Sequence, residues 1–446
     1  MASTAENLAA NMDWSAFGKA SELKTRIWFT LGALIVYRIG THVPIPGIDP
    51  NVLSQIFAQH SGGILGMFDM LAGGALFRMT VFALNVMPYI TASIIIQLLS
   101  AIVPSLEALK KEGEQGRLKL TQYSRYMTVG FALVQSYALA VGLENMAGTA
   151  GSAVIDPGFF FRLTTVVTLT GGTVFLMWLG EQISARGIGN GTSLIIYTGI
   201  VANLPVSLSN TFELARTGAI SGWFLVVLIA LLVAVLALCV ACERATRRIL
   251  VQYPKRQVGN KMFGGEASHM PLKINTAGVI PPIFASSLLL FPLTLASFTD
   301  VGHTGWLADV VAELGHGKPL FMILYAGMII FFAFFYTAIV FNPDETADNL
   351  RKYGGSVPGI RPGANTAKYL DFVLTRITVL GAAYLTVVCL LPEFLSSQYS
   401  VPFYMGGTSL LIVVSVTIDT IGRVQAHLFA HQYEGLIKKS KLRAKK

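Results

Sequence analysis

Long apolar runs alternate with short polar stretches along the whole chain. A hydrocarbon core of about 30 Å needs roughly 20 helical residues, and ten of the runs have suitable length. We therefore predict ten membrane-spanning helices, at residues 27–43, 79–103, 126–143, 162–180, 188–208, 222–242, 276–297, 319–341, 373–392 and 401–422. An even number of spans places both termini on one side of the membrane.

A further apolar segment, residues 63–76, is too short to cross the membrane. It is followed by Arg78 and by the span that begins at residue 79. Two interpretations fit this arrangement. The segment is either re-entrant, dipping into the membrane where protein or water surrounds it, or an amphipathic helix outside the membrane. Its length alone does not decide between them.

Helix-breaking residues lie within two of the predicted spans, Pro88 in the second and Pro281–Pro282 in the seventh. A proline removes a backbone donor and kinks a helix, so we expect bends at both places. Polar side chains lie near these prolines and on the third span, where a polar group is costly unless it is paired. They either join neighbouring helices or mark a seam at which helices part. They are Thr91, Gln97, Gln135, Asn275 and Thr276.

The basic residues are distributed unevenly between the two sets of loops. Of the 33 Lys and Arg residues, all but five lie in the set that includes both termini. Because cytoplasmic loops carry an excess of Lys and Arg, we expect cytoplasmic N- and C-termini. The exceptions are Arg38, Arg78, Arg162, Arg216 and Lys318.

The composition agrees with a multi-spanning membrane protein. Of the 446 residues, 53% are hydrophobic and 13% are charged, and the mean hydropathy is +0.60. These values exclude an ordinary soluble domain. The basic loops explain the net charge of +9 without nucleic acid. We expect no cleavable signal peptide, because residues 1–22 are polar or weakly amphipathic.

Two loops of the basic set are long, residues 243–273 and 342–371. Both mix apolar and Gly/Pro turn residues with charges, which favours ordered protrusions. Their basic surface suits anionic lipid, RNA or an acidic protein surface. The basic tail, residues 423–446, is expected to fray at its end.

We find no pattern typical of a catalytic, metal-binding or cofactor-binding site. The histidines are scattered, no HExxH or GxSxG motif occurs, and the pair Cys239–Cys242 lacks further ligands. The run Gly187–Gly191 is interpreted as a tight turn that starts a membrane helix. We therefore expect a protein that is not an enzyme and binds no cofactor, driven by a partner or by the proton-motive force.

A secondary transporter is the alternative class. Transporters place ionisable residues near the bilayer centre, at a cost of about 2.5–3.5 kcal/mol each. The candidates here, Arg38, Glu181 and Asp419, lie near the ends of predicted spans, and none has an evident partner near the bilayer centre. This pattern disfavours a transporter and its small-molecule substrate.

Eight ordered motifs resemble the SecY family, the channel-forming subunits of bacterial protein translocases. The resemblance covers about residues 23–438. The motifs are GALIVYRIGTHVPIPGID, NVMPYITASIIIQLLS, KKEGEQGR, FLMWLGEQISARGIGNGTS, AGVIPPIFASS, FFYTAIVFNPDETADNL, VPGIRPG and PFYMGGTSLLIVVSV.

The resemblance implies an all-α polytopic fold with ten helices in a clamshell of two inverted, pseudo-symmetric halves. Residues 1–26 would precede the first half (27–208, spans 1–5), and the second half would be 209–422 (spans 6–10). Segment 63–76 corresponds to the family's plug, with Arg78 at its hinge, and Asp69 would face the outer water-filled funnel. The plug residues are Ile64, Leu65, Met67, Phe68, Met70 and Leu71.

The resemblance also implies a constriction made by a ring of apolar side chains. A narrow apolar collar dewets and blocks ions. Thr192 departs from the family's isoleucine, and either its hydroxyl turns back to a helix carbonyl or the ring is wetter here. Val86 is a smaller departure. The implied ring residues are Val86, Ile90, Thr192, Ile196, Ile283 and Ile412.

Such a channel passes unfolded polypeptide outward and releases apolar segments into lipid through a lateral gate, here implied at Thr91, Gln135 and Asn275. The two long loops correspond to those on which the SecA motor and the ribosome dock. Arg361 is the main docking candidate, with Lys255 and Arg256 as others. The resemblance further implies the subunits SecE and SecG, a preprotein with its signal sequence as substrate, contact with lipid, and a place in the bacterial plasma membrane.

Overall fold

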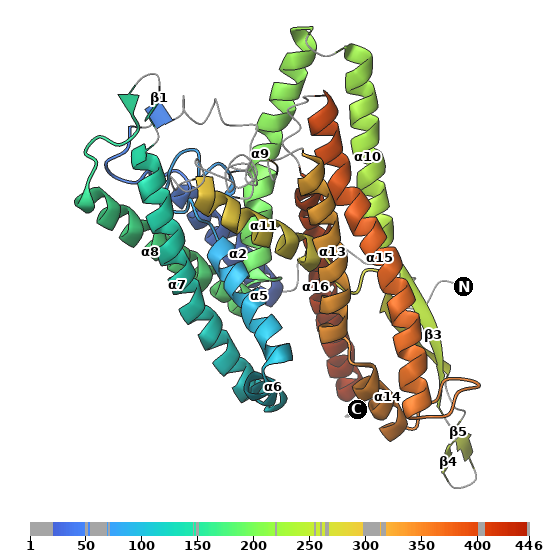
Figure 1. Ribbon diagram of the computed structural model, residues 1–446. Coiled ribbons are helices and arrows are strands. Elements are labelled where there is room, and N and C mark those ends of the chain that lie inside the picture. The colour runs from blue at the N-terminus through green and yellow to red at the C-terminus, as the bar shows by residue number, and fades with distance from the viewer. Residues whose placement is uncertain are drawn as a thin grey trace.

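Helices make up most of the molecule, as the apolar runs predict (Figure 1). The computed structural model describes residues 21–49, 52–53, 69, 72–145, 147–148, 151–218, 221–253, 256–258, 261–263, 267–297, 313, 318–399 and 406–443. Each of the ten predicted spans overlaps one of the following helices: α2 Ser21–Gly40, α5 Met87–Ile102, α7 Glu114–Asn145, α8 Phe159–Arg186, α9 Gly191–Arg216, α10 Gly222–Arg244, α11 Ile280–Ser297, α13 Pro319–Val340, α15 Ala364–Tyr399 and α16 Gly407–Arg443.

These helices differ in how well each could cross a bilayer alone. Within the described residues, seven are long and apolar enough: α7, α8, α9, α10, α13 with its continuation, α15 and α16. An eighth is formed if α5 is counted together with α6 (Pro104–Lys111), although the axis bends by 98° between them. The helix α11 is shorter, and α2 begins with charged residues. The mostly helical, many-span architecture is confirmed, whereas several predicted span boundaries change.

The prolines in the second and seventh spans start helices and do not kink them. Pro88 lies in the first turn of α5, and Pro281 and Pro282 lie in the first turn of α11. A proline is tolerated there because the first backbone N–H groups of a helix have no intrahelical partner. The predicted bends are therefore wrong, and α5 and α11 have 16 and 18 residues.

The chain before α5, residues 72–86, is irregular but not unpaired. The Ile45 N–H donates to the carbonyl of Met79 (2.9 Å), and the Val81 N–H donates to the carbonyl of Val43 (3.0 Å). Met79 and Asn85 adopt positive φ angles of 42° and 50°. Non-helical backbone is tolerated at membrane depth only where protein or water surrounds it, and here the loop after α2 supplies the partners.

The helices form two groups that touch along two lines (Figure 1). The first group is α2, α5, α7, α8 and α9, and the second is α10, α11, α13, α15 and α16. On one line α9 contacts α10 and α16, and on the other α11 contacts α5 and α7. Apolar cores lie inside each group, and a further core, which includes Val86, Ile196 and Ile412, joins them. The arrangement agrees in kind with the implied clamshell.

Both long loops contain regular structure and pack on each other. Strands β3 (Thr246–Gln252) and β6 (Ala267–Lys273) pair antiparallel, as do β4 (Arg256–Val258) and β5 (Lys261–Phe263). Ile249 and Leu272 share a small apolar core with Val357 from the second loop, which also holds α14 (Pro343–Lys352). Gln252 and Ser356 exchange backbone hydrogen bonds of 2.8 and 2.9 Å. We call residues 245–274 and 342–363 the protrusion.

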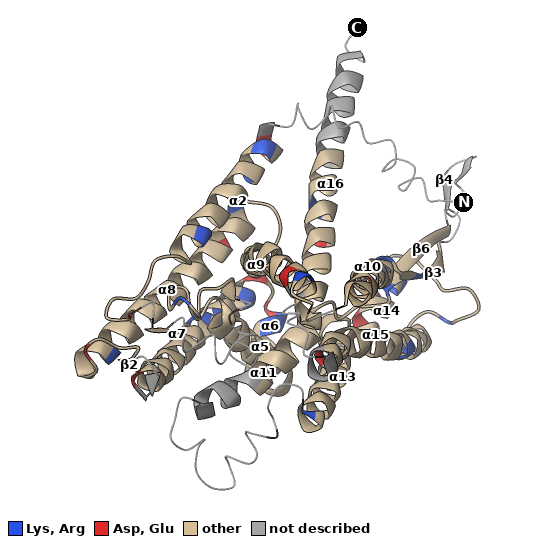
Figure 2. Cartoon of the chain, turned by 90° about the horizontal axis from the view of Figure 1, so that it is seen from above, with Lys and Arg blue, Asp and Glu red and all other residues tan. Residues whose placement is uncertain are grey.

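The remaining pair of strands, β1 (Ala147–Gly148) and β2 (Gly151–Ser152), forms a small hairpin between α7 and α8. The protrusion and α6 lie at the opposite end of the molecule (Figure 1). Charged residues are sparse along the helices, as the colouring in Figure 2 shows, which fits helices that face lipid or one another.

Two neighbouring glycines of α8 provide a test of this packing. A Cβ added at Gly172 would collide with the backbone carbonyl of Val81, whereas one added at Gly171 meets nothing within 4 Å. We expect Gly172→Ala to lower the free energy of unfolding by about 1–3 kcal/mol, because backbone cannot move aside cheaply. Gly171→Ala should leave it unchanged or slightly raised. Unfolding in mixed detergent, followed by tryptophan fluorescence, measures both, and equal stability of the two variants would contradict the packing.

Candidate functional site

The six implied ring residues come from both helix groups and lie in or beside one apolar cluster. Val86, Ile196 and Ile412 are buried members of this cluster, and Ile90 and Ile283 pack against it half-buried. Two of these side chains stand at the start of short helices, Val86 just before α5 and Ile283 in the first turn of α11. The structure therefore brings these five together, from α5, α9, α11 and α16.

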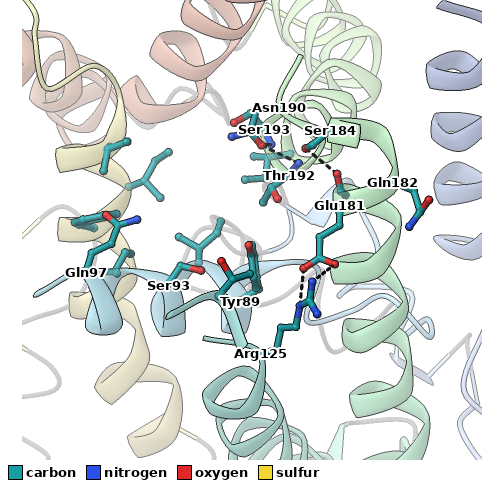
Figure 3. A pocket seen from close by; sticks show the side chains of 18 of the residues that line it. Tyr89, Ser93, Gln97, Arg125, Glu181, Gln182, Ser184, Asn190, Thr192 and Ser193 are labelled. Atoms are coloured by element: carbon teal, nitrogen blue, oxygen red, sulfur yellow. Dashed lines mark hydrogen bonds and ion pairs between the residues drawn. The ribbon is translucent and has the colours of Figure 1, made fainter. Parts of the chain in front are cut away.

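Thr192, the sixth ring residue, lies in the first turn of α9. Asn190 caps this helix, and its side-chain oxygen accepts hydrogen bonds from the N–H groups of Thr192 (3.1 Å) and Ser193 (3.4 Å). The Thr192 hydroxyl finds no hydrogen-bond partner among the described residues and points into a cavity (Figure 3). A residue in the first turn of a helix has no carbonyl of that helix four residues before it. The alternative in which the Thr192 hydroxyl turns back to a helix carbonyl is therefore wrong. This cap also confirms that the run Gly187–Gly191 starts a helix.

The cavity beside the ring has a volume of about 770 Å³. Ring residues Ile90, Thr192, Ile196 and Ile283 contribute to its lining. The α11 side of one wall is apolar, formed by Ile280, Ile283 and Phe284. The α5 side of that wall carries both the apolar Ile90 and Ile94 and the polar Tyr89, Ser93 and Gln97. The opposite wall is polar and comes from α7, α8 and the start of α9 (Figure 3). Its size and mixed lining suit a segment of polypeptide better than an ion.

An ion pair that the sequence does not reveal lies in the polar wall. The guanidinium of Arg125 on α7 donates two hydrogen bonds of 2.8 Å to the carboxylate of Glu181 on α8. The partners are 56 residues apart, and each lies near the end of its span, so hydropathy could not pair them. Asp419 is likewise paired, with Arg423 at 2.9 Å. Both pairs lie near the ends of the predicted spans, so neither contradicts the expectation that no acid has a partner near the bilayer centre.

The last residues of the predicted plug segment are held by the end of α2. The Tyr37 hydroxyl donates to the carbonyl of Ala72 (3.4 Å), and the Arg38 guanidinium donates to the carbonyl of Gly73 (3.2 Å). Arg78, the predicted hinge, is exposed, and its guanidinium Nη1 lies 2.8 Å from Nε2 of His42. The contacts of Tyr37 and Arg38 fix the end of the predicted plug segment, 63–76, and that of His42 fixes the chain just after it. Whether Arg78 acts as a hinge stays a prediction.

Asp69 does not face a water-filled funnel. It is 8% exposed, and its carboxylate accepts a 2.8 Å hydrogen bond from the N–H of Phe77. Burial raises the pKa of this carboxyl to about 6, although backbone hydrogen bonds oppose the rise. Asp69 therefore organises the turn at residues 72–78. The predicted plug side chains Ile64, Leu65, Met67, Phe68, Met70 and Leu71 lie outside the described residues.

The three residues implied for the lateral gate are not joined by hydrogen bonds to one another. The Thr91 hydroxyl donates to the carbonyl of Met87 in its own helix (3.1 Å), and Nδ2 of Asn275 donates to the Glu243 carboxylate (2.7 Å). Oε1 of Gln135 is buried without a hydrogen-bond partner among the described residues. The helices themselves do meet there, since Ile94 of α5 packs with Phe284 and Leu289 of α11. The gate role of the three polar residues stays a prediction.

Arg361 is exposed on the protrusion, in the turn between α14 and α15. Its backbone carbonyl accepts a hydrogen bond from the Thr366 hydroxyl (3.0 Å), which fixes the turn, and its guanidinium has no ion-pair partner in the described part of the chain. Arg256 lies in β4, and Lys255 lies outside the described residues. No group of three or more His, Cys, Asp or Glu that could hold a metal ion occurs among the described residues.

Comparison with solved structures supports the fold. A structure described as a protein-conducting channel superposes with a TM-score of 0.64 at 16% identity, covering 91% of this chain and 92% of its own. The channel protein Sec61 in a canine ribosome–channel complex gives a TM-score of 0.63, also at 16% identity, with the same coverage of 91% and 92%. At this identity the likeness concerns the fold alone.

Comparison with sequences identifies the family. The family model described as SecY matches residues 80–421. A protein translocase subunit SecY from Rickettsia conorii is 56% identical over 429 residues, which cover 96% of this chain and 99% of the relative. The subunit of the same description from Escherichia coli (strain K12) is 54% identical over 431 residues, covering 96% and 97%. The chain belongs to the SecY family.

Proposed function

We propose that this chain is the central, channel-forming subunit of a preprotein translocase. It conducts unfolded polypeptides across the membrane through the ring and releases apolar segments sideways between α5 and α11. The observation that carries the proposal is the ring itself, in which side chains from both helix groups meet beside an open cavity of about 770 Å³.

The ring suits a polypeptide better than a small solute. Five of its side chains are aliphatic, and a narrow aliphatic collar excludes water, so a hydrated ion meets a desolvation barrier. A threading polypeptide fills the gap itself, and flexible Ile and Val side chains adapt to any sequence that passes. The Thr192 hydroxyl adds one polar group at the cavity side.

Sideways release is supported by the contact between α5 and α11. This contact is made largely by apolar side chains, including Ile94 and Phe284, and the Phe284 ring packs edge-on against Phe332 of α13 at 5.8 Å. When α5 and α11 separate, an apolar segment of the substrate can make similar apolar contacts with each helix, so the free energy needed to separate them stays small. Thr91, Gln135 and Asn275 flank this line of contact and are proposed to tune its opening.

The protrusion is the proposed docking surface for the SecA motor and for the ribosome. Two structural neighbours are channels solved with ribosomes, a canine Sec61 complex and a yeast Ssh1 complex on the 80S ribosome. For this chain we propose Arg361, with Lys255 and Arg256, as the contact residues. Membership of the SecY family supports four further proposals for this chain. They are SecE and SecG as partner subunits, a bacterial plasma-membrane location, cytoplasmic termini and the absence of an enzyme activity.

Depletion tests the function directly. Cells depleted of this protein should accumulate signal-bearing precursors and fail to insert membrane proteins, measured by pulse-labelling and protease accessibility. Unimpaired export after depletion would refute the proposal.

The ring makes a prediction about ion leak. The double variant Val86→Gly with Ile90→Gly should raise the resting conductance of the protein in planar bilayers several-fold, because two apolar side chains leave the constriction. The matched control is Val226→Gly with Ile229→Gly on α10, whose side chains are 56% and 42% exposed away from the ring. Equal leak from both double variants would reject the ring assignment.

Arg361 makes a prediction about motor coupling. Arg361→Glu should lower SecA-driven translocation into vesicles by an order of magnitude, because it reverses an unpaired charge on the protrusion, and should leave thermal stability unchanged. Lys368→Glu, an exposed charge reversal on α15, serves as the control and should have little effect. Normal coupling in the Arg361→Glu protein would remove this residue from the docking surface.

A further inference from the structure

The ion pair between Arg125 and Glu181 is the distinctive feature of the cavity. Among the described residues that line the cavity, these two carry charge. Figure 3 shows the two side chains pointing toward each other at the side of the opening that lies across from Gln97. The side chains of Arg125 and Glu181 are 44% and 29% exposed, so the pair borders the space that a substrate would enter.

The pair is not needed to hold α7 against α8. Leu139, Ala140 and Leu143 of α7 share a buried apolar core with Phe161 and Leu169 of α8, well away from the pair. An exposed ion pair contributes only about 0.2–1 kcal/mol. A competing cation could therefore take the place of Arg125 at little cost, since the released guanidinium would return to water.

The cavity offers two chemically different surfaces to one ligand. The wall formed by α5 and α11 presents the apolar Ile94, Ile280 and Phe284 together with a few uncharged polar residues of α5, and the carboxylate of Glu181 lies in the opposite, polar wall. A signal sequence has a positively charged N-terminal region followed by 7–15 apolar residues. Its two parts match the two walls, the apolar part along α5 and α11 and the basic part at the carboxylate.

We propose that Glu181 is the acceptor for the basic N-terminal region of the signal sequence and that Arg125 is the resident counter-ion which this region displaces. The proposal rests on the channel function proposed above and deepens it. Binding of the basic region at Glu181 holds the N-terminus of the precursor on the side from which it entered. The exchange of one cation for another leaves no buried charge unpaired at any point.

The test uses two precursors that differ only in the N-terminal region, which carries three lysines in one and three glutamines in the other. A photo-crosslinker at Ser93, which lines the cavity, reports occupancy in the intact translocase complex in membrane vesicles. Glu181→Gln should lower the crosslinking yield of the lysine precursor about two- to fivefold, as expected for loss of one exposed ion pair. It should leave the glutamine precursor unchanged.

Two further variants separate binding from a merely structural role. Arg125→Gln removes the competitor and keeps the acceptor, so it should raise the preference for the lysine precursor. Glu107→Gln, an exposed acid on α6 that pairs with Lys111 at 2.7 Å, is the control and should change neither yield. A structural ion pair would instead make Arg125→Gln and Glu181→Gln equally harmful to both precursors.

The outcomes for the channel function and for this inference are distinguishable. If neither precursor crosslinks to the wild-type complex, the channel function itself fails. If both crosslink but Glu181→Gln lowers their yields equally, the inference is overturned and the channel function stands. If Glu181→Gln does not fold, the Arg125→Gln arm decides, and an unchanged preference for the lysine precursor there overturns the inference.

Discussion

The start of two helices inside the molecule is the constraint on which the rest of the structure depends. The helices α5 and α11 begin at Met87 and Ile280, among buried residues, with one proline in the first turn of α5 and two in the first turn of α11. The chain that leads to α5 is irregular, and lipid does not tolerate such backbone. It must therefore be surrounded by protein, which the loop after α2 and the close approach of Gly172 provide. The proposed constriction lies where these helices start, because Val86 and Ile283 are fixed there.

Hydropathy predicts this fold well but misplaces its internal boundaries. Each of the ten apolar runs corresponds to a helix, since burial in lipid selects apolar side chains over the full length of a span. The same criterion merges residues 79–86 with α5, because irregular chain buried in protein is as apolar as helix. Pro88 and Pro281 were the available signals, and they are compatible with both a kink and a start. Only the packing around them decides between the two.

For the candidate site, too, the sequence predicts some residues and misses others. The five aliphatic ring residues followed from the family resemblance, and the structure brings them into one cluster. The pair Arg125–Glu181 could not be predicted, because it depends on the rotation of α7 relative to α8, which hydrophobic pattern alone leaves undefined. The contacts of Asn275 with Glu243 and of Asp69 with the backbone of Phe77 also join residues whose proximity depends on tertiary structure. In these cases the sequence indicated only that charged or amide side chains lie near the ends of spans, without indicating their partners.

The bend of 98° between α5 and α6 has a structural consequence. None of the residues of α6 is buried, whereas α5 is set into the core with Ile94 and Ile96. The short helix α6, which also contacts α7, thus extends at a sharp angle from α5 at the end of the molecule that carries the protrusion (Figure 1). The junction is Val103, which is extended and followed directly by Pro104. Because α6 joins α5 through this one residue, a molecule that binds the exposed surface of α6 contacts an element directly connected to the helix that meets α11.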